Sequence, residues 1–445
     1  MTLESIASEF VGYVWGLPLV FLLVGSGLAF TIIYRFPQIR FFKHSIQVIS
    51  GKFDQEDEGA ISHFQALCTA LSATIGLGNI AGVAVAVSAG GPGAVFWMWI
   101  AAFLGMATKF TSISLSLIFR DVNSDGTILG GPMYSIKHGL GKYFLPLAYM
   151  YAFFTVLSAF GAGNMFQANQ MAAVLCRHAA IPVYASGIVF AILAGFVLIG
   201  GIRRIGRVAA GIVPFMVILY LLGAIGILAV NYTIIPELFA RIFSDAFSGT
   251  AAVGGFTGIA FREVVIQGVR RAVFSNEAGM GTAAMAHSAA RSTPVREGIV
   301  GLLGPFIDTI VVCTLTALVL ISTGVWVRTN GLAGSELTAA AFATVYGGAG
   351  AWLVTLTVVL FAFSTIISWS YYGEQGVVFL VGKGGIFPYR YIYIGFIVVG
   401  AIWKFGPVLN LSDALFGLLA IPNLIANFML TGSLKKELKE YEVSL

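Results

Sequence analysis

The sequence predicts an all-α polytopic membrane protein of about 11 spans, built as two inverted five-helix repeats behind one extra N-terminal transmembrane helix. The first observation is composition: 58% of the 445 residues are hydrophobic and only 10% are charged, whereas soluble proteins have about a quarter charged residues. The second is a pair of long apolar segments, each interrupted by glycines, that lie a little under half the chain apart. Long apolar runs also exclude a β-barrel, because the strands of a barrel alternate apolar and polar residues.

The predicted spans share an apolar run long enough to cross a bilayer. They lie near residues 14–34, 64–89, 94–118, 145–175, 183–200, 208–230, 264–289, 299–322, 351–372, 391–403 and 414–430. An interfacial helix is expected near residues 235–247, and a short helix is expected after Pro132.

Four parts follow from this pattern. They are an N-terminal part with the extra helix and an amphipathic and acidic linker (1–59), a first five-helix repeat (60–231), a second inverted repeat with its preceding outer loop (232–434), and a charged cytoplasmic tail (435–445).

The first interrupted segment carries Gly76-Leu-Gly78-Asn79 at its centre. Glycine lowers helix stability, and an unpaired polar group in hydrocarbon costs several kcal/mol. We therefore expect the helix to break here and to offer its backbone groups to a ligand. The alternative is close helix packing through small residues. The same residues fit a dinucleotide fingerprint, but no strand precedes them.

The second interrupted segment, Ser275 to Ala284, repeats the order Gly-x-Gly followed by Asn or Thr. Paired interruptions at matching places in two halves are the sequence sign of a secondary transporter's binding site. Free N–H groups at a helix start also attract an anion such as a carboxylate. The pair therefore favours a binding site over packing alone.

Two further spans carry polar residues on one helical face. Asn164, Gln167 and Gln170 form a stripe in the span near 145–175, and Thr365 and Ser368 are i,i+3 neighbours in a later span. Such residues avoid lipid. They either line the transport pathway or bond within and between helices.

Charged residues at membrane depth are few, and each is a functional hypothesis. Arg270 and Arg271 precede the second interruption, where they either form an outer gate or pair with Glu277. Asp308 either serves transport or pairs structurally, and Lys109 lies in an earlier span.

Charge distribution predicts the orientation. With the N-terminus outside, the predicted outer loops carry only Arg177, Arg241, Arg328 and Lys404, and the other loops, on the inner side, hold most of the basic residues. Basic loops stay in the cytoplasm, so the C-terminus is expected there. The net charge of +5 reflects these loops and indicates no nucleic-acid partner. No cleavable signal peptide is recognised.

The segment Gly90-Gly-Pro-Gly-Ala-Val-Phe-Trp-Met-Trp99-Ile-Ala-Ala-Phe-Leu-Gly105 resembles the signature of the sodium:alanine/glycine symporter family. Both interrupted segments are similar to that family as well, and the resemblance covers nearly the whole chain. It implies the LeuT-type fold of the amino acid–polyamine–cation superfamily. It also implies sodium-coupled uptake of alanine or glycine across a prokaryotic plasma membrane.

The resemblance implies a substrate site at the two interruptions. Backbone N–H groups at Gly76, Gly78 and Asn79 would hold the substrate carboxylate, and carbonyls near Asn276 and Gly279 would meet its ammonium. The side-chain pocket would be capped by Phe166 and Gln170.

The resemblance also implies a sodium site between the first and eighth core helices. Its ligands would be the carbonyls of Ser72 and Ile75 and the hydroxyl of Thr365. The family's next hydroxyl is replaced here by Ile366, so we expect Ser368, rather than Ser364, to substitute. A second sodium would take Thr74 with Asn79.

The expected partners are therefore a small amino acid, sodium and membrane lipid, with no cofactor besides the coupling ion. Histidines such as His63, His138, His178 and His287 lack the spacing of metal ligands. A proton-coupled carrier of the same fold and a channel are the alternatives. A membrane-embedded enzyme is disfavoured because no paired nucleophile and base is recognised.

Overall fold

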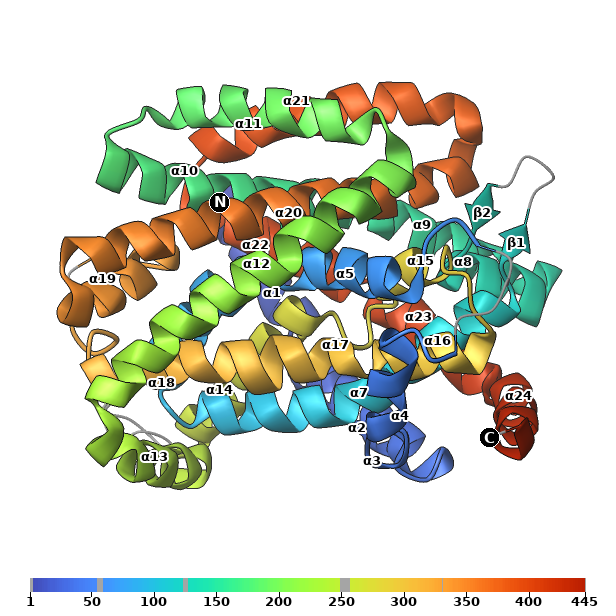
Figure 1. Ribbon diagram of the computed structural model, residues 1–445, viewed down its shortest axis with the longest axis horizontal. Helices are drawn as coiled ribbons and strands as arrows, with labels where there is room; N and C mark the ends of the chain where they lie inside the picture. Colours follow the sequence, from blue (N-terminus) through green and yellow to red (C-terminus); the bar gives the residue numbers. More distant parts are fainter. Residues whose placement is uncertain (1–2, 54–58, 123–126, 249–256, 330, 445) are drawn as a thin grey trace.

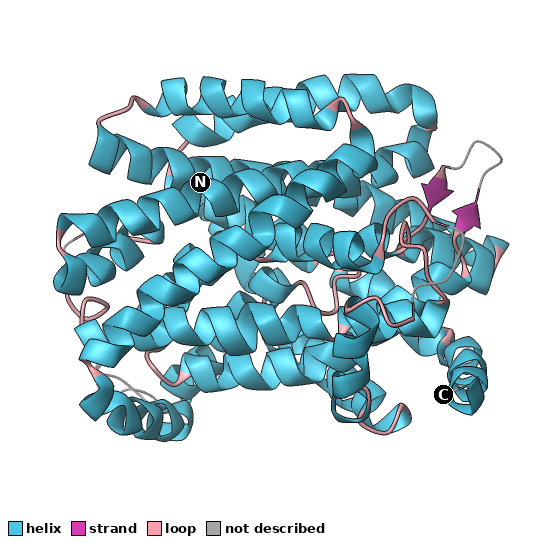
Figure 2. Cartoon of the chain, viewed as in Figure 1, coloured by secondary structure: helices cyan, strands magenta, loops and turns pink. Residues whose placement is uncertain are grey.

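The computed structural model describes residues 3–53, 59–122, 127–248, 257–329 and 331–444. Nearly all of this part of the chain is helical (Figure 2). Long helices run side by side along the horizontal direction of Figure 1. A small antiparallel hairpin of β1 (Asp121–Val122) and β2 (Ile128–Leu129) stands at one end.

The first half contains an N-terminal helix pair, one interrupted helix and several long spans. In chain order its helices are α1 (Leu3–Val14), α2 (Leu17–Ile33), α3 (Pro37–Arg40), α4 (Phe42–Ile49), α5 (His63–Thr74), η1 (Gly78–Gly82), α6 (Val83–Gly90), α7 (Ala94–Ile118), α8 (Pro132–Ser135), η2 (Ile136–Leu140), η3 (Lys142–Phe144), α9 (Leu145–Phe160), η4 (Gly161–Met165), α10 (Phe166–Ala179), α11 (Val183–Leu198), α12 (Gly201–Val230), η5 (Tyr232–Ile234) and α13 (Ile235–Ser248).

The second half begins with another interrupted helix and ends on a charged one. Its helices are α14 (Thr257–Asn276), α15 (Ala283–His287), α16 (Pro294–Gly301), α17 (Leu303–Pro305), η6 (Phe306–Cys313), α18 (Thr314–Thr323), α19 (Ser335–Tyr346), α20 (Gly348–Val381), η7 (Lys383–Gly385), α21 (Ile386–Ile402), α22 (Phe405–Gly417), α23 (Ala420–Met429) and α24 (Thr431–Ser444).

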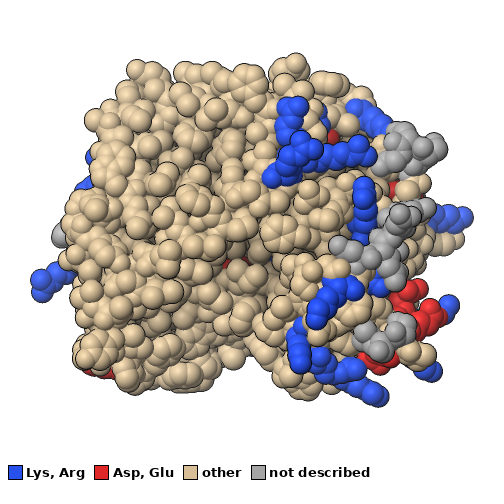
Figure 3. Space-filling model, viewed as in Figure 1, with Lys and Arg blue, Asp and Glu red and all other residues tan. Residues whose placement is uncertain are grey.

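Length and composition mark the membrane-spanning helices. Within the described residues, seven helices are long and apolar enough to cross a membrane, or eight if the bent pair α5 with η1–α6 counts as one span. Two shorter apolar helices are α2 and α11. Figure 3 shows a broad, almost uncharged band across the middle of this face, with Lys and Arg gathered toward the right-hand end. The chain is a membrane-embedded protein.

The observed helices match most predicted spans closely and extend others. The span predicted at 94–118 coincides with α7, whereas α20 continues nine residues beyond the predicted end at 372. The extension carries Glu374, whose carboxylate accepts two bonds from Arg390 at 2.8 and 3.0 Å. Because the charge is paired, the helix continues past its apolar part. The helix α19 was not predicted, and the acidic linker 54–58 lies outside the described residues.

The interrupted helices occupy the middle of the molecule. At the start of α5, the Ser62 hydroxyl accepts from Gln65 N–H at 3.3 Å, and the Gln65 side chain accepts from Ser62 N–H at 3.1 Å, which is a capping box. The core segment 66–84 that follows is buried throughout. Its break is packed between α14, α20 and η6.

Candidate functional site

The first interruption is a sharp turn between α5 and η1. The helix axis bends by 47° there. Gly76 N–H donates to Thr74 O at 2.8 Å and to the Asn79 side-chain oxygen at 3.1 Å. The helix therefore breaks where the glycines predicted it, and Asn79 satisfies part of the backbone that the break exposes.

Glycine is required at this turn because neighbouring helices approach the backbone closely. A Cβ atom on Gly76 would lie 2.4 Å from Thr365 Oγ1, and a Cβ atom on Gly78 would lie 2.9 Å from Ser275 Cα. Both distances are shorter than real Cβ contacts. The turn is consequently wedged between α20 and α14.

The second interruption spans Glu277 to Thr282, between α14 and α15. Glu277, Gly279 and Gly281 have φ values of 57°, 90° and 80°, a region that glycine enters without strain. Asn276 Oδ1 accepts from Ala278 N–H at 2.9 Å. Gly279 O accepts from the Asn423 side-chain amide at 2.7 Å. Part of this exposed backbone is thus already bonded to α23.

Asp308 joins the two interruptions. Its Oδ1 atom accepts from Asn79 Nδ2 at 2.8 Å and from Ser275 Oγ at 3.1 Å, and its Oδ2 atom accepts from Thr309 Oγ1 at 2.6 Å. The side chain is fully buried on η6, a π-helical segment. Three donors stabilise a carboxylate in a place where an unpaired charge would be costly.

Glu277 is held by Trp369 of α20 and by Thr282, and not by Arg270 or Arg271. Its Oε1 atom accepts from Trp369 Nε1 at 2.9 Å, and its Oε2 atom accepts from Thr282 Oγ1. Arg270 and Arg271 both donate to Asp413 on α22. Pairing with Glu277, one of the two alternatives, is therefore wrong: the arginines lie on the helical part of α14 and bond α22, whereas Glu277 is the first residue of the break.

Lys109 lies beside the second interruption. Gly105, one turn earlier on α7, would place a Cβ atom 2.5 Å from Ala278 Cβ. A Cβ atom on Gly304 would lie 3.0 Å from Lys109 Nζ. The lysine side chain, which is 4% exposed, is therefore placed between the second break and α17.

A cluster of oxygen atoms joins α5 to α20. Ser72 O accepts from Thr365 Oγ1 at 2.9 Å, and Ser72 Oγ accepts from Ser368 Oγ at 2.9 Å. Ser72 Oγ also donates to Ser364 O at 2.7 Å. Three of the four residues expected to hold sodium thus lie together. Ile75, the fourth, is in the turn that follows.

The other residues expected at the site are less closely grouped. Thr74 Oγ1 bonds back to Ala70 O at 3.1 Å, within its own helix. Phe166 is fully buried and meets Phe274 edge-on at 5.1 Å. Gln170 Oε1 accepts from Ser335 N–H at 2.9 Å, at the start of α19.

Gln167 was predicted as part of the polar stripe, but it was not among the residues expected to bind the substrate. Its Oε1 atom accepts from Leu77 N–H at 3.1 Å, inside the first interruption. The polar stripe with Gln170 was the available signal, since both residues belong to one face of α10. The sequence pattern does not distinguish which amide reaches the break.

Two interrupted spans that meet around buried acids and hydroxyls define a secondary membrane transporter. The sodium:alanine symporter family model matches residues 1–445. The chain belongs to this family and is a symporter of the cation-coupled amino-acid class, neither an enzyme nor a channel.

Three relatives illustrate the similarity. The chain is 42% identical over 450 residues to the sodium/alanine symporter AgcS of Methanococcus maripaludis, covering 99% of this chain and 98% of that one. It is 43% identical over 444 residues to an uncharacterized transporter of Haemophilus influenzae, covering 99% and 96%. It is 35% identical over 444 residues to the probable sodium/glutamine symporter GlnT of Bacillus subtilis, covering 99% and 91%.

Proposed function

We propose that the protein imports alanine, glycine or both together with sodium, by alternating access. The proposal includes a LeuT-type pair of inverted five-helix repeats at 60–231 and 232–434, about 11 spans in total. It also places the N-terminus outside and the C-terminus in the cytoplasm of a prokaryotic plasma membrane, following the distribution of basic residues.

The observation that carries the sodium proposal is the oxygen cluster of Ser72, Thr365 and Ser368. A small hard cation prefers oxygen ligands, and carbonyls freed by a broken helix are suited to sodium in this class of transporter. The Ser72 carbonyl and the two hydroxyls already lie within 2.9 Å of a neighbour in the cluster. Sodium would replace these mutual bonds, and Ile75 O would complete the site from the turn.

The substrate would lie between the two interruptions. N–H groups at the start of η1, around Gly78 and Asn79, suit a carboxylate. Carbonyls near Asn276 and the Asp308 carboxylate suit an ammonium group. The close approach of Ser275 to Gly78 leaves little room. This crowding supports a small substrate, and Phe166 would close its side-chain pocket.

Alternating access requires contacts that close each side in turn. Toward α19, Thr338 Oγ1 donates to Ile80 O at 3.2 Å. At the opposite end, Glu297 lies 2.6 Å from the Nδ1 atoms of both His63 and His287. Sodium bound between α5 and α20 would stabilise the closed arrangement, and opening would break the second set of contacts. The membrane potential supplies about 2.3 kcal/mol per charge per 100 mV.

Proton coupling is a second candidate, favoured by the two buried acids at the interruptions. Asp308 and Glu277 are 0% and 2% exposed. A carboxylate at membrane depth is a typical proton carrier. In this case the same fold would move a proton, not sodium, with the amino acid.

Uptake of labelled alanine into proteoliposomes tests both candidates. Accumulation only with an inward sodium gradient supports the sodium symporter. Accumulation that persists when choline replaces sodium, and that needs an acid exterior, supports proton coupling. A panel of labelled glycine and glutamine, competed with alanine, measures substrate preference in the same vesicles.

A further inference from the structure

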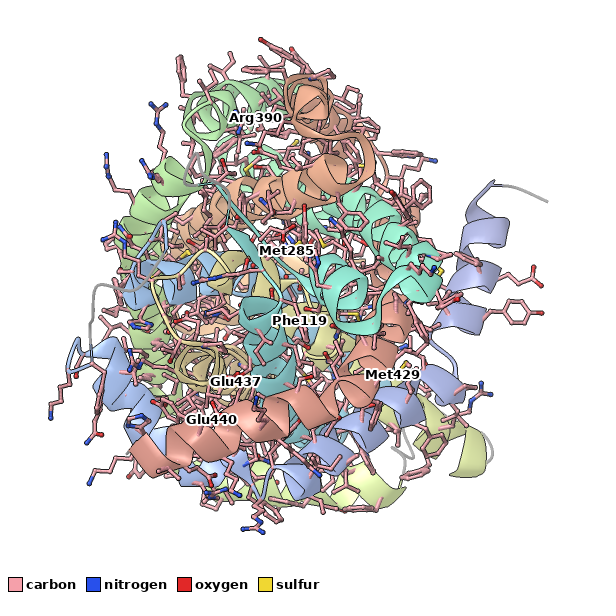
Figure 4. The ribbon with its side chains drawn as sticks, turned by 90° about the vertical axis from the view of Figure 1, so that its right-hand side faces the viewer. Phe119, Met285, Arg390, Met429, Glu437 and Glu440 are labelled. Carbon is pink, nitrogen blue, oxygen red and sulfur yellow. The ribbon has the colours of Figure 1, made fainter. Side chains whose placement is uncertain are left out.

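The C-terminal helix forms one wall of a basic cavity. Figure 4 shows α24 lying across the end of the bundle, beside the N-terminal helices. Leu434 and Leu438 are 0% and 6% exposed and attach the helix to the body. Between α24 and the turn that joins α2 to α3 lies a cavity of about 450 Å³.

Four cations line this cavity against one carboxylate. Arg35 and Arg40 come from the turn and α3, and Lys435 and Lys439 come from one face of α24. The carboxylate, Glu442, is paired with Arg40 at 2.8 Å. The cavity therefore has a surplus of positive charge and presents donors from two separate parts of the chain.

The turn is held in a conformation that side chains rarely adopt. Arg35 and Phe36 have φ values of 55° and 58°, in the left-handed region. Arg40 Nη1 donates to Tyr34 O at 3.4 Å, which ties α3 to the end of α2. Such strain persists only where surrounding contacts enforce it. In this turn, the left-handed backbone places both arginines at one cavity.

An apolar path leads to the cavity along α2. Phe21, Leu28 and Ile32 are 69%, 48% and 60% exposed, and their spacing puts them on one face of the helix. Ile33 lines the cavity itself. A ligand seated here could place an anionic group among the cations and hydrocarbon chains along α2.

We infer that this cavity binds the headgroup of an anionic phospholipid, with its acyl chains along α2. Guanidinium groups match phosphate oxygens, and basic pockets between membrane helices bind anionic headgroups. The exposed apolar face of α2 favours a lipid over a free phosphate, because a free phosphate would contact the cations alone. Lipid binding does not depend on sodium or amino-acid transport, so the lipid site and the proposed sodium symport can each fail independently.

Native mass spectrometry of the full chain in detergent tests the inference, with dioleoyl phosphatidylglycerol and dioleoyl phosphatidylcholine as probes. We expect one phosphatidylglycerol to be retained in preference to phosphatidylcholine. Lys435→Gln combined with Lys439→Gln should weaken phosphatidylglycerol binding about 25-fold, since each basic residue near an anionic lipid contributes about fivefold. Both lysines are exposed, so the fold should tolerate the change.

Matched variants separate a site from general charge. Lys52→Gln with Lys142→Gln removes two exposed cations elsewhere and should leave binding unchanged. Lys435→Arg with Lys439→Arg should retain it. Equal binding of the two lipids, or equal weakening in the control pair, would overturn the inference. Displacement of phosphatidylglycerol by millimolar glycerol 3-phosphate would overturn it too, because a free phosphate would then be the ligand.

Discussion

The Asn79 side-chain amide donates to the Asp308 carboxylate at 2.8 Å, across 229 residues of sequence. Ser275 donates to the same oxygen at 3.1 Å. One buried carboxylate therefore contacts residues of both interrupted helices. Movement of either interruption relative to η6 must change its hydrogen bonds, which is a physical route for coupling the two halves.

Replacing Asn79 with Ala should weaken alanine binding by about tenfold to a hundredfold, the cost of losing a hydrogen bond to a charged group. The variant removes one hydrogen-bond partner from Gly76 N–H and one from the Asp308 carboxylate. The equilibrium Kd for alanine is the measurement. Asn164→Ala is a control, since that buried amide bonds Tyr393 O at 2.6 Å instead. Near-normal affinity in Asn79→Ala would show that the carboxylate is held elsewhere.

Thr365→Ala should raise the sodium concentration for half-maximal uptake by about tenfold, as expected for one lost oxygen ligand, with a smaller effect on maximal rate. Thr365→Ser keeps the hydroxyl and should stay near wild type. Thr357→Ala is a matched control on α20, because the Thr357 hydroxyl bonds Leu353 O within its own helix, at 2.8 Å. An unchanged sodium dependence would remove Thr365 from the site.

Gly76→Ala should abolish uptake even though it adds only one methyl group. The new Cβ would meet Thr365 Oγ1 at 2.4 Å and Thr365 Cβ at 3.3 Å, so either the Thr365 hydroxyl or the spacing of α5 and α20 must change. Gly82→Ala is the control, because its nearest neighbour outside its own turn would be 3.9 Å away. Initial rates in proteoliposomes at equal protein content decide the comparison. Full activity of Gly76→Ala would contradict the close packing of the first turn.

Gln167→Ala should impair alanine binding more than Gln170→Ala does. Gln167 accepts from Leu77 N–H inside the interruption, whereas Gln170 bonds the start of α19. We expect about a fivefold or greater loss of affinity for the first, from one lost buried bond. The alanine Kd of both variants is compared in one preparation. A larger loss of alanine affinity in Gln170→Ala than in Gln167→Ala would place the substrate nearer to α19.

Trp369→Phe should lower the apparent unfolding temperature measurably. It removes the donor to Glu277 Oε1, and a bond to a charged group contributes about 1.5–3 kcal/mol. Trp97→Phe removes a bond to the neutral Ala246 O at 3.1 Å and should cost less. Thermal unfolding followed by tryptophan fluorescence or by light scattering provides the comparison. Equal stability of the two variants would argue against a charged Glu277.

Local sequence was sufficient for much of the architecture. Apolar runs and the scarcity of charge predicted a membrane protein, because a bilayer excludes unpaired polar groups whatever the fold. The glycines around Gly76 and Gly279 predicted both interruptions. Glycine lowers the stability of a helix at its own position, whichever helices pack around it. Helical spacing also placed Thr365 and Ser368 on one face, where both now bond Ser72.

Contacts between distant elements were decided by the tertiary structure alone. The two arginines before the second interruption pair with Asp413, which is 142 residues or more away. Gln167, not Gln170, reaches the first turn, and Asp308 accepts from residues of both interrupted helices. Helical periodicity determines which residues share a face of one helix. It contains no information about which other helix packs against that face, and that packing selects the partner of each buried polar group.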